Sequence, residues 1–130
     1  MKFQPDTLEG VNTITRHESG RVWVGGTAFD HSVLVPWVGA VQAWGAATPA
    51  ELTAEHFARI VAFKPEVVIF GSGAKLRFVA PALTRALIDQ RIGIETMDTG
   101  AACRTYNVLV SEGRRVLAAV LVEPGTAGVL

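Results

Sequence analysis

The chain has 130 residues, enough for one hydrophobic core, so we predict one domain over residues 1–130 with loosely ordered tails at 1–10 and 123–130. Apolar residues make up 49% of the chain and charged residues 18%, which predicts a large core or an apolar surface that meets a partner. Twelve basic residues balance twelve acidic ones without a run of either sign, which argues against binding to nucleic acid.

The apolar runs and the cysteine content bear on the cellular compartment. Residues 1–6 lack the apolar stretch of a signal peptide, and the apolar runs elsewhere are far shorter than a membrane span. A single cysteine, Cys103, rules out an intrachain disulfide and a cysteine-rich zinc site. We therefore expect a cytoplasmic protein with no membrane span.

The first part of the chain, residues 11–45, alternates short apolar segments with tight turns. The apolar segments lie around residues 14, 22–24, 29 and 33–36, and glycine or polar residues separate them. This pattern predicts a β-meander.

The second part alternates helical patterns with fully apolar strands. We expect strands at 67–70, 93–97 and 116–122, which is typical of βαβ units in a sheet covered on both faces. The first helix begins at Thr48, with Glu51 closing a capping box, or at Thr53, and it ends at Lys64. A second helix is predicted at 79–90. The third begins at Asp98 or Thr99 as N-cap and ends before Gly113.

Four sequence segments are more distinctive than the rest of the chain. They are residues 70–73, 93–99, 101–109 and 112–114. In this order, and above all in Met97-Asp98-Thr99 followed by residues 104–107 (Arg-Thr-Tyr-Asn), they resemble a family of uncharacterised bacterial and archaeal proteins. The family is similar to the mitochondrial NADH:ubiquinone oxidoreductase complex assembly factor 3. The resemblance covers residues 11–122.

This resemblance implies a fold and, less directly, a function. The implied fold is α/β with three layers: a central, mostly parallel five-stranded sheet, helices on one side, and a helix plus a small β-sheet on the other. The mitochondrial relative is similar to a scaffold that helps to assemble respiratory complex I through protein contacts. The prokaryotic members have no assigned activity.

A candidate binding cleft lies where the predicted strands end. The turn at 71–73 follows one buried strand, and Asp98 follows the next, so the two turns should meet at the carboxyl edge of the sheet. Lys75 and Arg77 could attract an anion to exposed amides. The turn lacks the glycine spacing of a dinucleotide fingerprint or a P-loop, so a plain strand-to-helix turn is the competing interpretation. The candidate set is Gly71, Ser72, Gly73, Lys75, Arg77, Asp98, Thr99, Arg104 and Asn107.

Two of these assignments have structural alternatives. Asp98 is either a carboxylate that acts with Arg104 or simply the cap of a helix. Arg104, Asn107 and Ser111 share one stripe of the third helix. That stripe is a solvated face, a hydrogen-bonded brace to a neighbouring loop, or a binding surface.

No catalytic set is recognisable. Cys103 lies near the start of a predicted helix, where a thiolate would be favoured, but no histidine lies near it in the sequence. The three histidines have no metal-ligand spacing. We predict no catalytic residue, no metal and no cofactor, and we interpret Trp23, Trp37 and Trp44 as core or interface aromatics.

Two hypotheses about function remain. The first, which we favour, is a non-enzymatic protein-binding or assembly module that meets a partner or a second copy. The second is a small-molecule or anion-binding enzyme that uses the cleft between residues 71–78 and 97–104.

Overall fold

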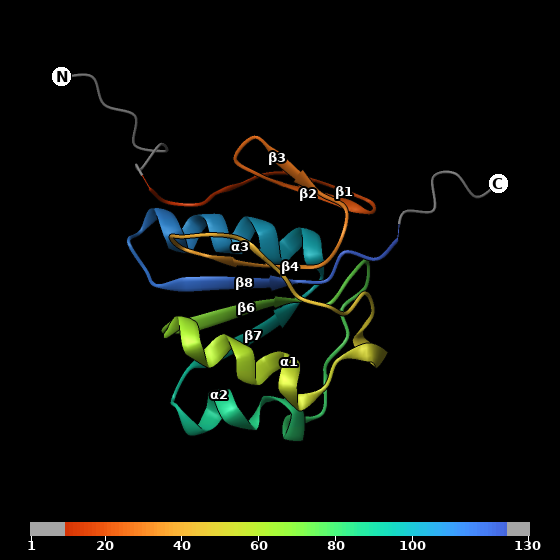
Figure 1. The fold of residues 1–130 in the computed structure, drawn as a ribbon, viewed down its shortest axis with the longest axis vertical. Coiled ribbons are helices and arrows are strands. Elements are labelled where there is room, and N and C mark those ends of the chain that lie inside the picture. The colour runs from red at the N-terminus through yellow and green to blue at the C-terminus, as the bar shows by residue number, and fades with distance from the viewer. Residues whose placement is uncertain (1–9, 125–130) are drawn as a thin grey trace.

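A computed structural model describes residues 10–124 of the chain (Figure 1). A small antiparallel sheet contains β1 (Ile14–Glu18), β2 (Arg21–Val24) and β3 (Thr27–Phe29) in that order. A larger sheet has the order β5-β4-β8-β6-β7, and its strands are β4 (Val33–Pro36), β5 (Gln42–Ala43), β6 (Val67–Gly71), β7 (Gly93–Met97) and β8 (Val116–Val120). The tails predicted at 1–10 and 123–130 fall mostly outside the described residues.

The larger sheet is mixed, with two parallel and two antiparallel strand pairs, whereas the family resemblance implied a mostly parallel sheet. Strands β7, β6 and β8 pair in parallel, whereas β4 pairs antiparallel with both β8 and β5. All residues of β6 and β8 are buried, as the continuous apolar runs at these positions predicted. The α/β class predicted from the sequence is confirmed, with this sheet as its centre.

The predicted meander is wrong at its last strand. Only β1, β2 and β3 form the small sheet, and β4 leaves it to pair with β8 in the larger one. The physical reason is burial, because all four residues of β4 are buried. A strand without a polar face needs cover on both sides, which the centre of the larger sheet provides.

The long helix α3 (Thr99–Ser111) lies between the larger sheet and the small one, in contact with β6, β8 and β1 (Figure 1). One hydrophobic core fills this side, and Tyr106 is buried within it. Its hydroxyl group donates to the carbonyl oxygens of Asn12 at 2.9 Å and Pro36 at 3.1 Å. The buried tyrosine therefore connects α3 to the segment that precedes β1 and to the end of β4.

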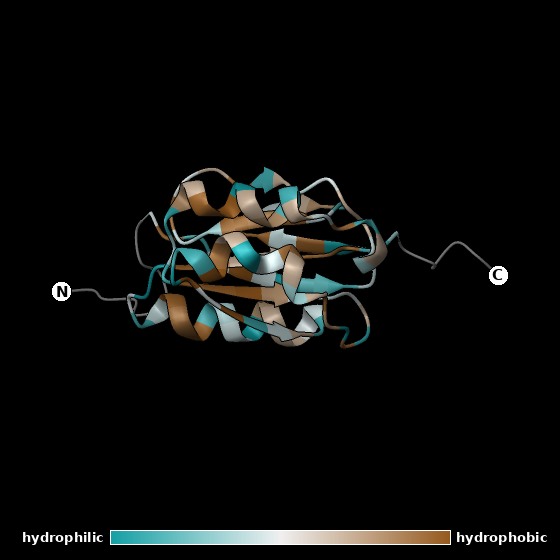
Figure 2. Ribbon diagram, turned by 90° about the horizontal axis from the view of Figure 1, so that it is seen from below, coloured by the Kyte–Doolittle hydropathy of each residue, from teal (hydrophilic) through white to brown (hydrophobic). Residues whose placement is uncertain are grey.

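Short helices cover the opposite face of the larger sheet. They are the 3-10 helix η1 (Pro49–Glu51), α1 (Ala54–Ala58), η2 (Arg59–Phe63), η3 (Pro81–Thr84) and α2 (Arg85–Asp89). A second core lies beneath them, where Trp44 is fully buried and contacts Phe57 and Phe70 edge to face. Figure 2 shows runs of apolar residues along strands of the sheet, whereas the helices carry both apolar and hydrophilic residues.

The first two predicted helices differ from the structure in their bounds. Both proposed starts of the first helix are used, since η1 follows Thr48 and α1 follows Thr53. Glu51 accepts from the Ala47 amide instead of closing a capping box on Thr48. Within α1 the corresponding acceptor is His56 Nδ1, which receives the Thr53 amide at 3.0 Å.

The second helix is shorter than the predicted 79–90. It begins as η3 at Pro81 and continues as α2 only to Asp89. Ala80 is extended, with ψ of 139°, because a following proline disfavours the helical conformation.

The third predicted helix is confirmed at both ends. The Asp98 carboxylate accepts from the Ala101 amide at 2.9 Å, so Asp98 is the N-cap. Gly113 follows the C-cap with a φ of +82°, as expected of a glycine at that position. None of the helices in residues 10–124 combines the length and apolar character that crossing a membrane requires.

The three tryptophans have different environments. Trp44 is a core residue, as described above, whereas Trp23 and Trp37 are half-buried. The guanidinium groups of Arg16 and Arg21 lie over the Trp23 ring, at 4.7 and 5.9 Å from its centroid. Cation–π contacts therefore cover part of the ring that the small sheet leaves accessible.

Candidate site at the carboxyl edge of the sheet

The carboxyl ends of β6 and β7 form the switch point of the larger sheet. The connection from β6 to β7 carries α2 on one face, and the connection from β7 to β8 carries α3 on the other. In open α/β sheets, ligands bind in the crevice that such opposite connections create. The structure thus brings the predicted glycine turn at 71–73 beside Asp98 and Thr99, as expected.

Hydrogen bonds close this crevice instead of leaving it open. Ser72 N donates to Met97 O at 2.9 Å. The Gly73 amide donates to Thr99 Oγ1 at 2.9 Å, and the Thr99 amide donates back to Gly73 O at 2.8 Å. Thr99 is 3% exposed, and its hydroxyl group donates onward to Leu121 O at 2.8 Å. These bonds join the ends of all three parallel strands and occupy the amides of Ser72, Gly73 and Thr99.

Gly71 allows this close approach. A Cβ atom at this position would lie 3.0 Å from Ala102 Cβ, Thr99 Cα and Thr99 Oγ1. The absence of a side chain at Gly71 therefore lets the first turn of α3 pack directly on β6.

Ser72 organises the loop that carries the two predicted cationic residues. The serine is 1% exposed, and its hydroxyl group donates to Lys75 O at 2.6 Å and accepts the Arg77 amide at 2.9 Å. The side chains of Lys75 and Arg77 are exposed. The loop thus holds the cations at the surface, outside the closed crevice.

The remaining members of the candidate set lie along α3. Asp98 serves as the helix cap, and Arg104 is exposed. Within residues 10–124, the ion pairs join other residues, namely Arg16 with Glu18 and Arg114 with Glu66.

Asn107 is the hydrogen-bonded brace that one sequence interpretation proposed. Its carboxamide accepts from Ile14 N at 2.9 Å and donates to Ile14 O at 2.8 Å. The small sheet is thereby fixed to the helix.

A hollow of about 390 Å³ opens next to the closed crevice. Gly73, Ala74 and Thr99 form one wall, the end of β1 with the turn to β2 (residues 17–20) forms another, and the segment at 121–124 forms the third. Of the predicted set, only Gly73 and Thr99 line it. Nothing in the sequence marked residues 17–20 as part of a site. Glu123 could have been predicted, because it follows the third parallel strand at the same edge of the sheet.

The Glu123 carboxylate lies at the glycine turn. Its Oε1 atom accepts from the Ala74 amide at 3.4 Å, and a Cβ atom added to Gly73 would lie 3.1 Å from the same carboxylate. The chain therefore places an acidic group of its own where an anion was predicted to approach the turn.

His17 contributes the imidazole group of this hollow. Partial burial lowers its pKa, the Asp98 carboxylate opposes that shift, and the Arg104 cation adds to it. A neutral imidazole is therefore favoured at this position.

Gly73→Val is expected to lower the free energy of unfolding by about 1 to 3 kcal/mol. Gly73 has a φ of +104°, which residues with a side chain rarely adopt, and the added Cβ would also press on Glu123. Urea denaturation monitored by circular dichroism measures the change. A variant as stable as the unmodified chain would contradict the assigned turn conformation.

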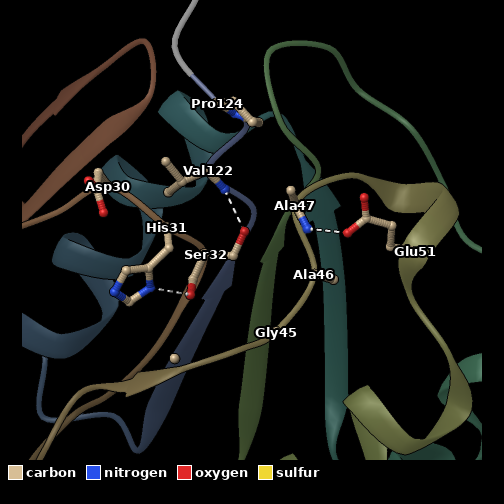
Figure 3. A pocket seen from close by; sticks show the side chains of 10 residues that line it. Asp30, His31, Ser32, Gly45, Ala46, Ala47, Glu51, Val122 and Pro124 are labelled. Carbon is tan, nitrogen blue, oxygen red and sulfur yellow. Dashed lines mark hydrogen bonds between the residues drawn. The ribbon is translucent and has the colours of Figure 1, made fainter.

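A second hollow, of about 400 Å³, shares Val122 and Pro124 with the first (Figure 3). Residues 30–32, Ala43 and residues 45–47 line it together with Glu51, Val122 and Pro124. Its walls are fixed by hydrogen bonds, since the Val122 amide donates to Ser32 Oγ at 2.8 Å and the Ala47 amide donates to Glu51 at 2.8 Å. None of the residues predicted as a site lies here.

Cys103 is poorly placed to act as a nucleophile. Its side chain is buried, and this burial raises the pKa of the thiol to about 12. The thiolate is the reactive form, so little of it exists at neutral pH.

Iodoacetamide at pH 8 is expected to alkylate Cys103 in the folded chain at least about a hundredfold more slowly than in the chain unfolded by urea. Mass spectrometry of the intact protein against time gives both rates. Equal rates would show that the thiol is accessible and ionised in the folded state.

These features define a mixed α/β domain in which a helix and a small antiparallel sheet cover one face of the central sheet. The chain matches the family model described as "Protein of unknown function (DUF498/DUF598)" over residues 14–121, and it belongs to that family. The family resemblance seen in the sequence is therefore confirmed.

Three relatives illustrate the likeness. The chain is 33% identical over 103 residues to "NADH dehydrogenase [ubiquinone] 1 alpha subcomplex assembly factor 3" of Mus musculus, covering 78% of this chain and 55% of the relative. It is 34% identical over 107 residues to an uncharacterised protein of Rhodobacter capsulatus, covering 82% and 77%. A crystal structure of a Bordetella parapertussis protein has a TM-score of 0.83 and 36% identity, covering 88% of this chain and 98% of that one. The chain spans about half the length of the mammalian relatives that it matches.

Proposed function

We propose that this chain is an assembly-factor-like module that acts through protein contacts. The closed crevice is the observation that carries the proposal. At the place where a related sheet architecture would bind a ligand, Gly73, Thr99 and Leu121 bond to one another. The edge therefore serves to hold the strands and α3 together.

The relatives support the same class of function. The mammalian relatives are named as assembly factors of an NADH dehydrogenase subcomplex. An assembly factor acts by holding other proteins, so its surface has to offer contacts. The cytoplasmic location and self-association inferred from the sequence stay predictions.

The surface of this chain offers apolar side chains for such contacts. Within residues 10–124, five large apolar residues are substantially exposed, and because they lie on different elements, a single partner surface would cover only some of them. They are Val38, Leu76, Phe78, Ile88 and Val108. Exposed apolar groups gain free energy when a partner covers them.

Affinity purification of the tagged full chain from its own cells tests the proposal. We expect at least one protein to be retained in a fixed ratio to the chain, in amounts that resist a wash at about 0.5 M salt because apolar contacts are not screened. An untagged lysate and a tagged unrelated domain of similar size are the controls. Recovery of a chain with no stoichiometric protein would contradict the proposal.

The ligand-binding alternative makes a different prediction. If an anion binds at the turn, phosphate or a nucleotide should raise the melting temperature of the unmodified chain, and Lys75→Ala should remove the effect. We expect no such shift, because the Gly73 amide is already bonded and Glu123 lies at the turn.

A further inference from the structure

The connection between β6 and η3 exposes large apolar side chains next to cationic ones. Leu76 is 53% exposed and Phe78 is 75% exposed, the largest value among the exposed large apolar residues within 10–124. Lys75 and Arg77 alternate with them and are also exposed. In Figure 1 this connection is the green segment that runs from β6 down one side of the domain toward α2.

Two hydrogen bonds of Ser72 fix the conformation of this loop. Its buried hydroxyl group donates to Lys75 O and accepts from the Arg77 amide, so backbone groups on both sides of Leu76 are fixed. The bonded loop spans residues 72–77. Leu76 therefore projects from a closed turn, and Phe78 follows directly after it.

The cations of the loop are available for an outside partner. The ion pairs within residues 10–124 join Arg16 with Glu18 and Arg114 with Glu66, and they include neither Lys75 nor Arg77. A surface that covers Leu76 and Phe78 would also meet Lys75 and Arg77. Such a surface would be most complementary if it combined an apolar pocket with carboxylates at its rim.

We propose that residues 75–78 are a docking loop for a partner protein whose binding surface is an apolar pocket rimmed by Asp or Glu. This inference rests on the proposed function and adds to it the place and the chemistry of the contact. Phe78 and Leu76 enter the pocket, while Lys75 and Arg77 pair with the carboxylates. Aromatic and Arg side chains are typical of the residues that contribute most to protein interfaces.

A protein fits these observations better than an anionic membrane. Two cations contribute only about 2 kcal/mol at a lipid surface. The whole chain has equal numbers of basic and acidic residues, so its net charge adds nothing to this attraction. A protein pocket can instead enclose both apolar side chains and exclude water from the ion pairs.

Photo-cross-linking identifies the contact. The photoreactive residue p-benzoylphenylalanine replaces Phe78 in one variant and Val108 in a control, because Val108 is 56% exposed but lies on α3. We expect the Phe78 position alone to cross-link the retained partner, at a peptide with apolar residues flanked by Asp or Glu. A contact peptide without acidic residues would overturn the proposed chemistry.

Binding of the purified partner then measures the loop. We expect the double variants Leu76→Ser with Phe78→Ser, and Lys75→Glu with Arg77→Glu, each to raise Kd at least about tenfold. The second should also weaken the dependence of Kd on salt. The control Val108→Ser should leave Kd within about twofold. Because all these side chains are exposed, unchanged thermal melts are expected.

The outcomes separate this inference from the proposed function. A retained partner whose Kd is unaffected by both double variants overturns the docking loop and leaves the proposed function standing. No stoichiometric partner of the unmodified chain overturns both. Co-sedimentation with phosphatidylglycerol vesicles that the loop variants abolish, without such an effect on a protein partner, would assign the loop to a membrane instead.

Discussion

Gly71→Val is expected to lower the free energy of unfolding by about 3 kcal/mol, one of the two largest effects that we predict for a single substitution. A Cβ atom alone would stand 3.0 Å from Ala102 Cβ and from Thr99 Cα, and the two methyl groups of valine need further space. Thr99 Cα belongs to the backbone of α3, so relief requires the helix to move away from β6. That movement would lengthen the bonds between Thr99 and Gly73.

Chemical denaturation of Gly71→Val and of a matched control measures this effect. Gly26 is the control position, because a Cβ there meets nothing within 4 Å and its φ is not positive. Gly26→Val is expected to change the free energy of unfolding by less than about 1 kcal/mol. If the two variants were equally stable, the close packing of α3 on β6 would be wrong.

Thr99→Val is expected to lower the free energy of unfolding by about 2 to 4 kcal/mol, although valine has nearly the same shape as threonine. The hydroxyl group of Thr99 accepts from Gly73 N and donates to Leu121 O, and both bonds are buried. Removing it leaves the Gly73 amide and the Leu121 carbonyl oxygen without this buried partner. Each such group costs about 1 to 3 kcal/mol.

Thr99→Ser separates the hydrogen bonds from the packing. Serine keeps the hydroxyl group and loses only a methyl group, so a loss of about 1 kcal/mol is expected. Hydrogen exchange of the Gly73 amide provides a second measurement, and it should be faster in Thr99→Val than in Thr99→Ser. Equal exchange and equal stability in the two variants would show that the hydroxyl bonds do not hold the strand ends together.

The amino-acid sequence by itself determined the features that depend on near neighbours. The ends of α3 were predictable because Asp98 and Gly113 act on backbone groups within a few residues of themselves. The buried strands β6 and β8 were predictable because a continuous apolar run has no polar face to expose. The four distinctive segments identified the family. The adjacency of the turns after β6 and β7 was predictable, because parallel strands end at the same edge of a sheet.

Only the tertiary structure decided what those turns do. The same residues, Gly73 and Thr99, suit an open anion site or a closed set of bonds, and the choice depends on Leu121 and Glu123, which come from a third strand end. Asn107 reaches Ile14 across 93 positions, so the sequence could propose a brace without showing its partner. Strand β4 is buried on both faces because it pairs with β8, a strand from the other half of the chain. Contacts of this kind depend on which distant segments of the chain meet, and local sequence patterns do not predict those meetings.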